Sequence, residues 1–157
     1  MAMQRSAVLV KPDGLQRGLI GEIIGRFERK GLKLIGLKMT YLTDDQLSDW
    51  YVEHKDKGFF KDLKSFMGSM PIVVMAWEGI DAIATIRKLV GTTSGREAEA
   101  GSIRGDFSMS QQLNLIHASS SEADAKHEIE IVFDAEELCA YKSVVESVIY
   151  ADFERGK

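Results

Sequence analysis

The sequence predicts an α+β fold, on the strength of three observations. Short apolar runs rich in β-branched residues, at 6–11 and 71–77, indicate buried strands. Segments with apolar residues at helical spacing, 19–27 and 81–90, follow each of them. A further predicted strand follows each helix, so a strand–helix–strand unit occurs twice. This is the pattern of a ferredoxin-like βαββαβ sandwich.

The first predicted strand, Ser6–Lys11, ends at the turn-forming sequence Pro12-Asp13-Gly14. Lys11 therefore stands at the carboxyl end of a strand, where ligands bind in many α/β folds. A solvated lysine before a turn would give the same pattern. Gly31 is suited to close the helix that follows, as a glycine just past a helix end. Leu32–Met39 is predicted to be the second strand.

A helical hairpin is predicted as an insertion after the second strand. Its first helix begins at Thr43-Asp44-Asp45-Gln46, which matches a capping box. This helix extends toward His54, for which we expect a surface or packing role. The second helix restarts at Gly58. Phe59, near the tip, offers a face on which a base could stack, but the pattern equally allows Phe59 to belong to the core.

A long ordered loop is predicted in the second half of the chain. The strand Pro71–Trp77 is the most continuous apolar run, so we expect it to be central, and Asp81 is expected to cap the next helix. Periodicity is lost at 91–112, and a loop this long is usually either functional or disordered. Ile103 and Phe107 provide apolar anchors, which favours an ordered loop.

The segment after His117 is predicted to close the sheet. Ser121-Glu122-Ala123-Asp124 resembles a helix start. Ile129, Ile131 and Phe133 alternate with polar or smaller residues, which predicts the last strand over 129–133. A short helix from Asp134 and an amphipathic tail over 141–153 complete one predicted domain covering residues 1–157.

Composition excludes several classes of protein. The chain is 45% hydrophobic and 28% charged, with a formal net charge of -4 and a pI of about 5.4, so no dedicated nucleic-acid surface is expected. The single cysteine cannot form an internal disulfide, and no Cys/His spacing indicates zinc. The longest apolar run is too short to span a membrane and no targeting segment is evident, so we expect a cytoplasmic protein.

The stretch Asn114–Ser119 is the candidate catalytic segment, because an apolar pair leads directly into His117 and small residues follow. An imidazole is largely unprotonated at neutral pH and can act as a base or nucleophile. A carboxylate such as Glu128 could bind one ring nitrogen and leave the other free to attack. A lone histidine is more often structural, so the assignment depends on the residues elsewhere. His127 is a second histidine, for which we expect an exposed surface position.

The remaining special residues predict a phosphate site. Cations that converge on one pocket bind polyanions, and a triphosphate fits this set best. There is no Walker A motif, no kinase glycine-rich loop and no aspartate pair for two metals, which favours covalent transfer through a histidine. The set consists of Lys11, Arg87, Thr93, Arg104, Asn114 and His117.

Four motifs resemble the nucleoside diphosphate kinase family along nearly the whole chain: Lys11-Pro12-Asp13-Gly14, Arg17–Ile23, Ile103–Phe107 and Asn114–Ser119. The resemblance implies ping-pong transfer of a γ-phosphoryl group from a nucleoside triphosphate to His117 and then to a nucleoside diphosphate. It also implies Mg²⁺ carried on the nucleotide phosphates, no metal held by the protein itself, and a symmetric homo-oligomer, most often a hexamer.

The resemblance also implies roles for individual residues. His117 is the phosphorylated nucleophile, and Glu128 orients its other nitrogen together with Ser119. Stacking of the base on a phenyl ring implies little base discrimination. The other implied roles are phosphate binding by Arg87, Thr93 and Arg104, ribose binding by Lys11 and Asn114, contact of Tyr51 with the histidine, and base contact by Phe59 and Leu63.

The chain departs from the family pattern at three places. Ser120 replaces a common aspartate, and we expect no loss of catalysis because serine caps a helix about as well. Gly58 stands where a proline is frequent before the stacking phenylalanine. Ala100 stands where the family usually has a proline before Gly101, which predicts a more flexible loop.

Two other functions fit the sequence less well than a nucleoside diphosphate kinase does. An RNA-binding module on the same fold would need exposed aromatic residues on the central strands, which the sequence lacks. A catalytically inactive nucleotide sensor would be expected to have lost motif residues, but all are present.

Overall fold

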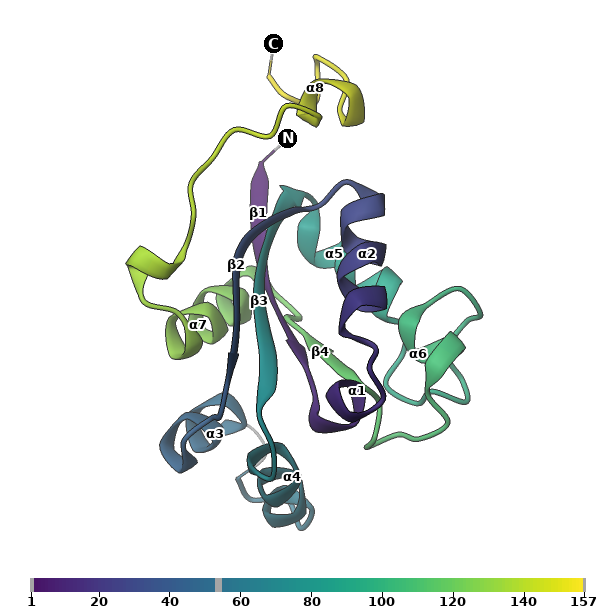
Figure 1. Ribbon diagram of the computed structural model, residues 1–157, viewed down its shortest axis with the longest axis vertical. Coiled ribbons are helices and arrows are strands. Elements are labelled where there is room, and N and C mark those ends of the chain that lie inside the picture. Colours follow the sequence, from purple (N-terminus) through teal and green to yellow (C-terminus); the bar gives the residue numbers. More distant parts are fainter. Residues whose placement is uncertain (1, 53–54, 157) are drawn as a thin grey trace.

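The structure is a computed structural model that describes residues 2–52 and 55–156. Its centre is a four-stranded antiparallel sheet with strand order β2-β3-β1-β4 (Figure 1). The α+β, ferredoxin-like prediction is confirmed. The strands are β1 (Met3–Val10), β2 (Lys33–Thr40), β3 (Ile72–Ile80) and β4 (Ile116–Ala118).

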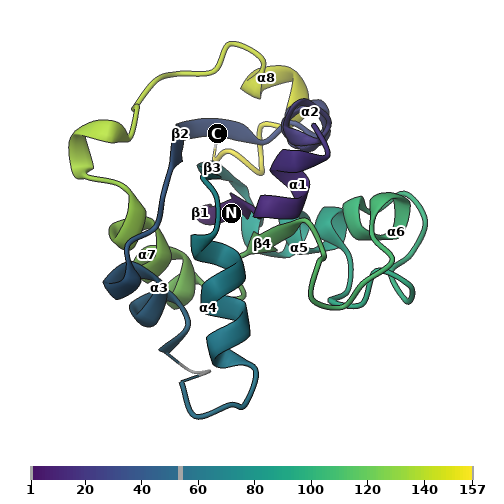
Figure 2. The ribbon, with the colours of Figure 1, turned by 60° about the horizontal axis from the view of Figure 1, so that its bottom comes forward.

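Helices cover both faces of this sheet (Figures 1 and 2). One face carries α2 (Ile20–Lys30), α5 (Ala82–Val90) and the short α6 (Ile103–Phe107). The other carries α3 (Asp44–Trp50) and α4 (Phe60–Gly68), which form the predicted hairpin, and α7 (Glu122–Val132). In the described part of the chain, residues 2–52 and 55–156, the other short helical segments are α1 (Pro12–Gln16), η2 (Ala135–Glu137) and α8 (Glu146–Ile149).

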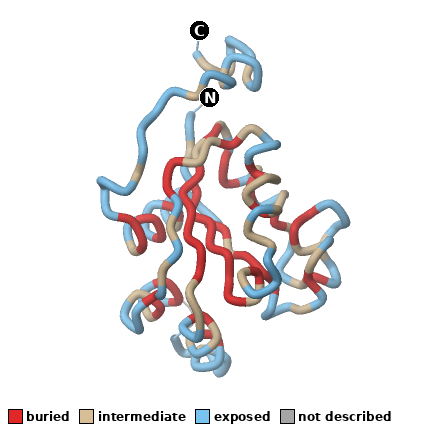
Figure 3. The backbone as a smooth tube through the Cα atoms, in the orientation of Figure 1, coloured by how far each residue is buried: buried red, intermediate tan, exposed pale blue. Residues whose placement is uncertain are grey.

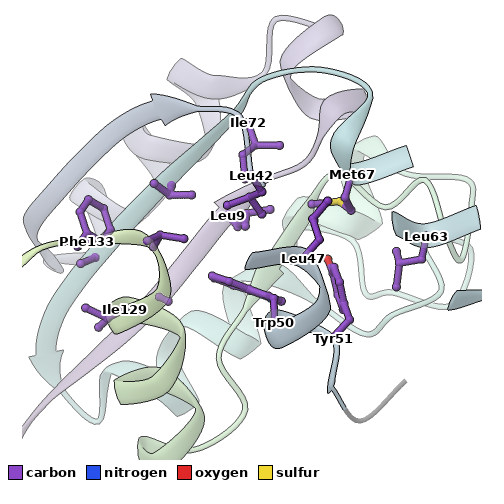
Figure 4. Packing of buried hydrophobic residues seen from close by; sticks show 14 of the residues in the cluster. Leu9, Leu42, Leu47, Trp50, Tyr51, Leu63, Met67, Ile72, Ile129 and Phe133 are labelled. Carbon is purple, nitrogen blue, oxygen red and sulfur yellow. The ribbon is translucent and has the colours of Figure 1, made fainter. Parts of the chain in front are cut away.

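The two helical layers leave the central strands no open face. Alternate residues of β1 point to opposite layers, so Leu9 packs with α3, α4 and α7, whereas Val8 packs with α2 and α5. Strands β1 and β3 are buried along most of their length (Figure 3). Trp50 and Ile129 pack against Leu9 in the first layer (Figure 4). This burial argues against an RNA-binding sheet surface, which needs exposed aromatic residues.

Local signals in the sequence identified several element boundaries correctly. Thr43 and Gln46 form the expected capping box, with reciprocal bonds of 3.2 and 3.0 Å. Gly31 ends α2 in the left-handed conformation, at φ 98°. Strand β3 is internal to the sheet, as its continuous apolar sequence predicts.

The prediction for the last strand was wrong. Residues 129–132 are the end of α7, and the fourth strand is instead β4, which contains His117 itself. Within α7 the buried residues are Ala125, Glu128, Ile129 and Val132, which is helical spacing. Ser121 caps this helix by accepting a hydrogen bond from the Asp124 N–H at 3.1 Å. The alternation at 129–133 was too short to distinguish a strand from the end of a helix.

Three smaller predictions also need correction. Asp81 makes no side-chain cap bond, because its backbone is left-handed at φ 49°. The predicted Pro12-Asp13-Gly14 turn is the first part of helix α1, and the loop 91–112 contains α6. The tail over 141–153 is helical only at α8. The expectation for His54 lies outside the described residues. Within residues 2–52 and 55–156, no helix is long and apolar enough to cross a bilayer.

The loop between α5 and β4 is ordered by its own contacts. Ile103 is fully buried, and Arg26 of α2 pairs with Asp106 at 2.6 Å. Ser102 donates its N–H to the Glu99 carbonyl at 3.1 Å, and Gly101 between them has φ 91°. A turn with a positive-φ glycine at its third position has the pattern of type II, in which proline is favoured at the second position.

Ala100 occupies that second position, and within the described residues its N–H makes no hydrogen bond. Ala100→Pro should therefore raise the free energy of unfolding by about 0.4–1 kcal/mol, by restricting the unfolded chain. Urea denaturation of the purified protein measures this. Gly101→Ala is the matched control and should lower stability by on the order of 1 kcal/mol, because alanine disfavours a positive φ. A lower melting temperature for Ala100→Pro would contradict the turn assignment.

Candidate active site

A cavity of about 640 Å³ opens beside the carboxyl end of β1. It lies between the tip of the α3–α4 hairpin, the end of α5, the loop after α5 and strand β4. Most residues predicted from sequence line it; Ser119 and Glu128 lie behind His117 and do not. The predicted residues that line the cavity are Lys11, Tyr51, Phe59, Leu63, Arg87, Thr93, Arg104, Asn114 and His117.

His117 projects from β4, where its backbone pairs with Leu9 of β1. Its Nε2 lies 2.6 Å from Glu128 Oε1. When Nε2 donates its proton to that carboxylate, Nδ1 keeps its lone pair. The ring edge also contacts Trp50, with centroids 5.4 Å apart. The imidazole is thus fixed on two sides, and it presents one nucleophilic nitrogen.

Glu128 is itself held in place by a buried serine. Ser119 Oγ donates to Glu128 Oε2 at 2.6 Å, and it accepts the N–H of Ala7 in β1 at 3.0 Å. Ser119 has no exposed surface, and Glu128 is 7% exposed. A buried carboxylate with both oxygens hydrogen-bonded cannot rotate without losing a bond. The orientation of His117 therefore depends on the first strand through Ser119.

Tyr51 joins the site to the hairpin. It is 7% exposed and belongs to the same core cluster as Leu63 (Figure 4). It also lines the cavity, as His117 does. Burial, assisted by the negative charge of Glu128, raises the pKa of its hydroxyl well above the ordinary value. The hydroxyl is therefore a neutral group at physiological pH.

Lys11 is a buried cation, only 8% exposed. Its Nζ donates to Asn114 Oδ1 at 2.7 Å, and Asn114 Nδ2 donates to the carbonyls of Thr93 and Gln111 at 2.9 and 2.8 Å. Burial, with a contribution from the charge of Arg104, lowers the pKa of Lys11 to about 8. Keeping Lys11 charged at pH 7 thus costs about 3 kcal/mol of folding free energy.

Arg104 is attached to the main chain around the cavity. Its Nε, Nη1 and Nη2 donate to the carbonyls of Asn114, Gly91 and Ile116 at 3.3, 3.0 and 2.6 Å. A guanidinium has five N–H groups, so these three bonds leave two for a ligand. Burial and the charge of Arg87 lower the pKa of Arg104 to about 10, so it stays protonated at neutral pH.

The sequence left open whether Phe59 is exposed for stacking or buried in the core, and the structure shows that it is exposed. Phe59 is 48% exposed at the start of α4, whereas Leu63 is buried in the core. The next residue, Phe60, packs against that core instead. Phe59 therefore offers an apolar face at the mouth of the cavity, although Lys57 Nζ already lies 5.8 Å from its ring centroid.

The cavity is electropositive, because it contains Lys11, Arg87 and Arg104. Asp13 is the carboxylate whose charge acts on two of these cations. Within the described ranges, no group of three or more His, Cys, Asp or Glu residues could hold a metal. Three cations with one carboxylate acting on two of them leave an excess of positive charge around the imidazole, which suits a ligand with several negative charges, such as a chain of phosphates.

Comparison with known proteins is consistent with this geometry. The family model for nucleoside diphosphate kinase matches residues 4–138. The chain belongs to the nucleoside diphosphate kinase family. It is therefore a phosphotransferase, and nucleotides are its substrates. The match includes the cavity residues named above, from Lys11 to His117, and also Glu128.

Individual members of the nucleoside diphosphate kinase family resemble the chain over most of its length. It is 49% identical to the enzyme of Halalkalibacterium halodurans, over 91% of this chain and 97% of the relative. A solved nucleoside diphosphate kinase from Halobacterium salinarum, in complex with CDP, gives a TM-score of 0.92 at 42% identity, covering 95% and 99% of the two chains. A family member from Babesia bovis gives 0.91 at 50% identity, covering 94% and 99%.

The sequence reasoning missed several residues of this kinase site. Asp13 accepts the Leu115 N–H at 3.0 Å, although it had been considered only as a turn residue. Trp50 lies within the predicted hairpin, and its contact with His117 depends on a long-range packing that no local pattern reveals. Gln111, Gln112 and Ser120 also line the cavity. For Asp13 a signal existed, since it lies within the Lys11–Gly14 motif.

The lowered pKa of Lys11 predicts how nucleotide affinity depends on pH. Bound phosphates stabilise the ammonium form, so binding above pH 8 requires uptake of a proton by Lys11. The affinity for ADP should be steady from pH 7 to about 8 and then fall by up to about tenfold per pH unit. Isothermal titration calorimetry from pH 7 to 9.5 measures it. Lys11→Arg should flatten the decline, because arginine stays charged. A constant affinity in the wild type would contradict the assignment.

The buried serine predicts a stability effect. Ser119→Ala leaves the Ala7 N–H and one oxygen of Glu128 without their partner, and should lower the free energy of unfolding by about 1–3 kcal/mol. Ser120→Ala is the matched control, because Ser120 is exposed, and should change stability by less than about 0.5 kcal/mol. Chemical denaturation compares the two variants. Equal effects would show that Ser119 is not the support for Glu128.

Proposed function

We propose that this nucleoside diphosphate kinase works by a ping-pong mechanism with a phosphohistidine at His117. One observation carries the proposal: His117 lines the cavity, while its Nε2 is bound to Glu128 at 2.6 Å. A fixed imidazole with a free nitrogen is an activated nucleophile. The cations around it are suited to the charge that develops on a transferring phosphoryl group.

The reaction has two half-reactions. Nδ1 of His117 attacks the γ-phosphorus of a nucleoside triphosphate, and the bond from that phosphorus to the β–γ bridging oxygen breaks. The nucleoside diphosphate leaves with the electron pair of that bond. A terminal β-phosphate oxygen of a second nucleoside diphosphate then attacks the phosphorus, and the phosphorus–Nδ1 bond breaks. The imidazole is regenerated, so one cavity serves both nucleotides in turn.

Different cavity residues bind different parts of the nucleotide. Arg87, Thr93 and Arg104 bind the phosphates, since two of them are cations and the third carries a hydroxyl. Lys11 and Asn114 bind the ribose hydroxyls, with Lys11 also near the phosphates. Tyr51 contacts His117 and limits the movement of its ring. These assignments are supported by the shared cavity that all six residues line.

Phe59 and Leu63 form the base-binding end of the cavity. Stacking on a phenyl ring recognises a flat face and makes few demands on the edge of the base. We therefore expect purine and pyrimidine nucleotides to be accepted alike. The CDP complex of the Halobacterium salinarum relative supports a diphosphate ligand in this fold.

Mg²⁺ enters as part of the nucleotide substrate. The described residues contain no group of three or more His, Cys, Asp or Glu side chains that could hold a metal ion. Glu128 binds His117 and Ser119 through its two oxygens, and Asp13 binds the Leu115 N–H through Oδ2 alone. A Mg²⁺ ion carried on the nucleotide phosphates would need no protein ligand and would neutralise charge on the transferring group.

We also propose that the enzyme is a cytoplasmic homo-oligomer, a hexamer by family resemblance. Large apolar side chains on the edge strand β2 and on the tail support self-association. Their exposure in the single chain is 58% for Met39, 82% for Val148 and 74% for Phe153.

Labelling with γ-³²P ATP tests the mechanism. The wild-type protein should acquire one acid-labile label on His117, and addition of any nucleoside diphosphate should remove it. His117→Ala should take up no label and lose turnover. His127→Ala is the matched control and should behave as wild type, because that histidine is half exposed on α7 and faces Asp49 outside the cavity. Label on another residue, or turnover by His117→Ala, would refute the phosphohistidine.

A further inference from the structure

The backbone just before His117 is held in an unfavourable conformation. Leu115 has φ 72°, in the left-handed region that leucine rarely adopts. Its side chain is fully buried, so the conformation is imposed by the surroundings and is not a surface irregularity. Such outliers persist only where neighbouring groups hold them, and they are common at functional sites.

The groups that hold Leu115 come from the Lys11–Gly14 segment. Strand β1 pairs with β4 only as far as Val10 opposite Ile116, because the chain then turns into α1 at Pro12. The Lys11 N–H still donates to the Leu115 carbonyl at 2.9 Å. The Leu115 N–H, which has lost its strand partner, donates instead to Asp13 Oδ2 at 3.0 Å. A side-chain carboxylate thus continues the ladder where the main chain has turned away.

Other hydrogen bonds also restrain the segment before His117. Arg104 binds the carbonyls on either side of Leu115, at Asn114 and Ile116. Lys11 binds the side chain of Asn114 at 2.7 Å. The charge of Asp13 acts on both Lys11 and Arg104. Loss of the Asp13 carboxylate would therefore leave the Leu115 N–H without its acceptor, two residues before the nucleophile, and would also remove an anion that acts on both cations.

We propose that Asp13 is a positioning residue for phosphoryl transfer: its carboxylate holds the left-handed turn at Leu115 and thereby fixes His117 relative to Lys11 and Arg104. The proposal rests on the phosphohistidine mechanism proposed above. Asp13 itself need not touch the nucleotide. A small displacement of a nucleophile can cost a large factor in rate even when the substrate still binds.

Two variants separate positioning from simple stability. Asp13→Ala removes the acceptor and should slow phosphorylation of His117 by on the order of 10- to 100-fold in rapid-quench experiments with ATP. At a pH well below the pKa of Lys11, its affinity for ADP should not weaken, because every cation of the cavity is still present and charged. Asp13→Asn keeps an oxygen that can accept the Leu115 N–H and should restore most of the rate at pH 7. Its affinity for ADP should begin to fall at a lower pH than in the wild type, since the anion facing Lys11 is gone.

Glu137→Ala is the matched control, because Glu137 is a carboxylate that accepts a backbone N–H, that of Asp134 at 2.9 Å, away from the cavity. It should phosphorylate at the wild-type rate. If Asp13→Ala does not fold, the Asp13→Asn protein provides a second measurement. The Leu115 amide proton should shift upfield in its NMR spectrum, because a bond to a neutral amide is weaker than one to a carboxylate.

The outcomes are distinguishable. A wild-type protein without label on His117 refutes the phosphohistidine mechanism itself. A labelled wild type, with folded Asp13→Ala reacting at the same rate, refutes only the role of Asp13. An Asp13→Asn protein as slow as Asp13→Ala, or with an unchanged Leu115 amide signal, refutes it as well.

Discussion

The site depends above all on one buried carboxylate. Glu128 lies on α7, yet its two oxygens bind His117 on β4 and Ser119 just beyond β4, and Ser119 in turn binds Ala7 of β1. A charged group in the interior is tolerated only when it is fully hydrogen-bonded. The same bonds that satisfy Glu128 therefore join a helix to two strands. The contacts that orient the His117 ring are therefore the same contacts that join α7 to strands β1 and β4.

The buried cations of the cavity destabilise the folded protein when no ligand is bound. Lys11 is buried beside Arg104, and burial lowers the pKa of both. A charged group that is destabilised in the free protein gains more when an anion arrives than an exposed group would. Part of the free energy of folding is thus sacrificed so that the positive charge is in place before the ligand binds. Lys11 and Arg104 are already held by hydrogen bonds in the structure without a ligand.

Local chemistry was readable from the sequence, whereas long-range contacts were not. The capping box at Thr43 and the glycine at 31 act within a few residues, so their sequence patterns were sufficient. Strand 129–133 was mistaken, because five residues cannot separate a period of two from the end of a helix. The predicted cavity residues came from the family resemblance, and four of them, Lys11, Arg104, Asn114 and His117, lie within its motifs. The contacts of Trp50 and Asp13 could not be predicted, because their partners are 67 and 102 positions away, although Asp13 lies within a motif.

The three carbonyls bound by Arg104 limit what this cavity can adapt to. A guanidinium attached to Gly91, Asn114 and Ile116 cannot follow a ligand by changing rotamer. If Arg104 binds phosphates as proposed, every nucleotide would have to place its phosphates at the same position. The difference in size between purines and pyrimidines would then be accommodated at the other end of the cavity, beside half-exposed Phe59. On the proposed mechanism, the cavity would be rigid where the phosphoryl group is transferred and adaptable where the base binds.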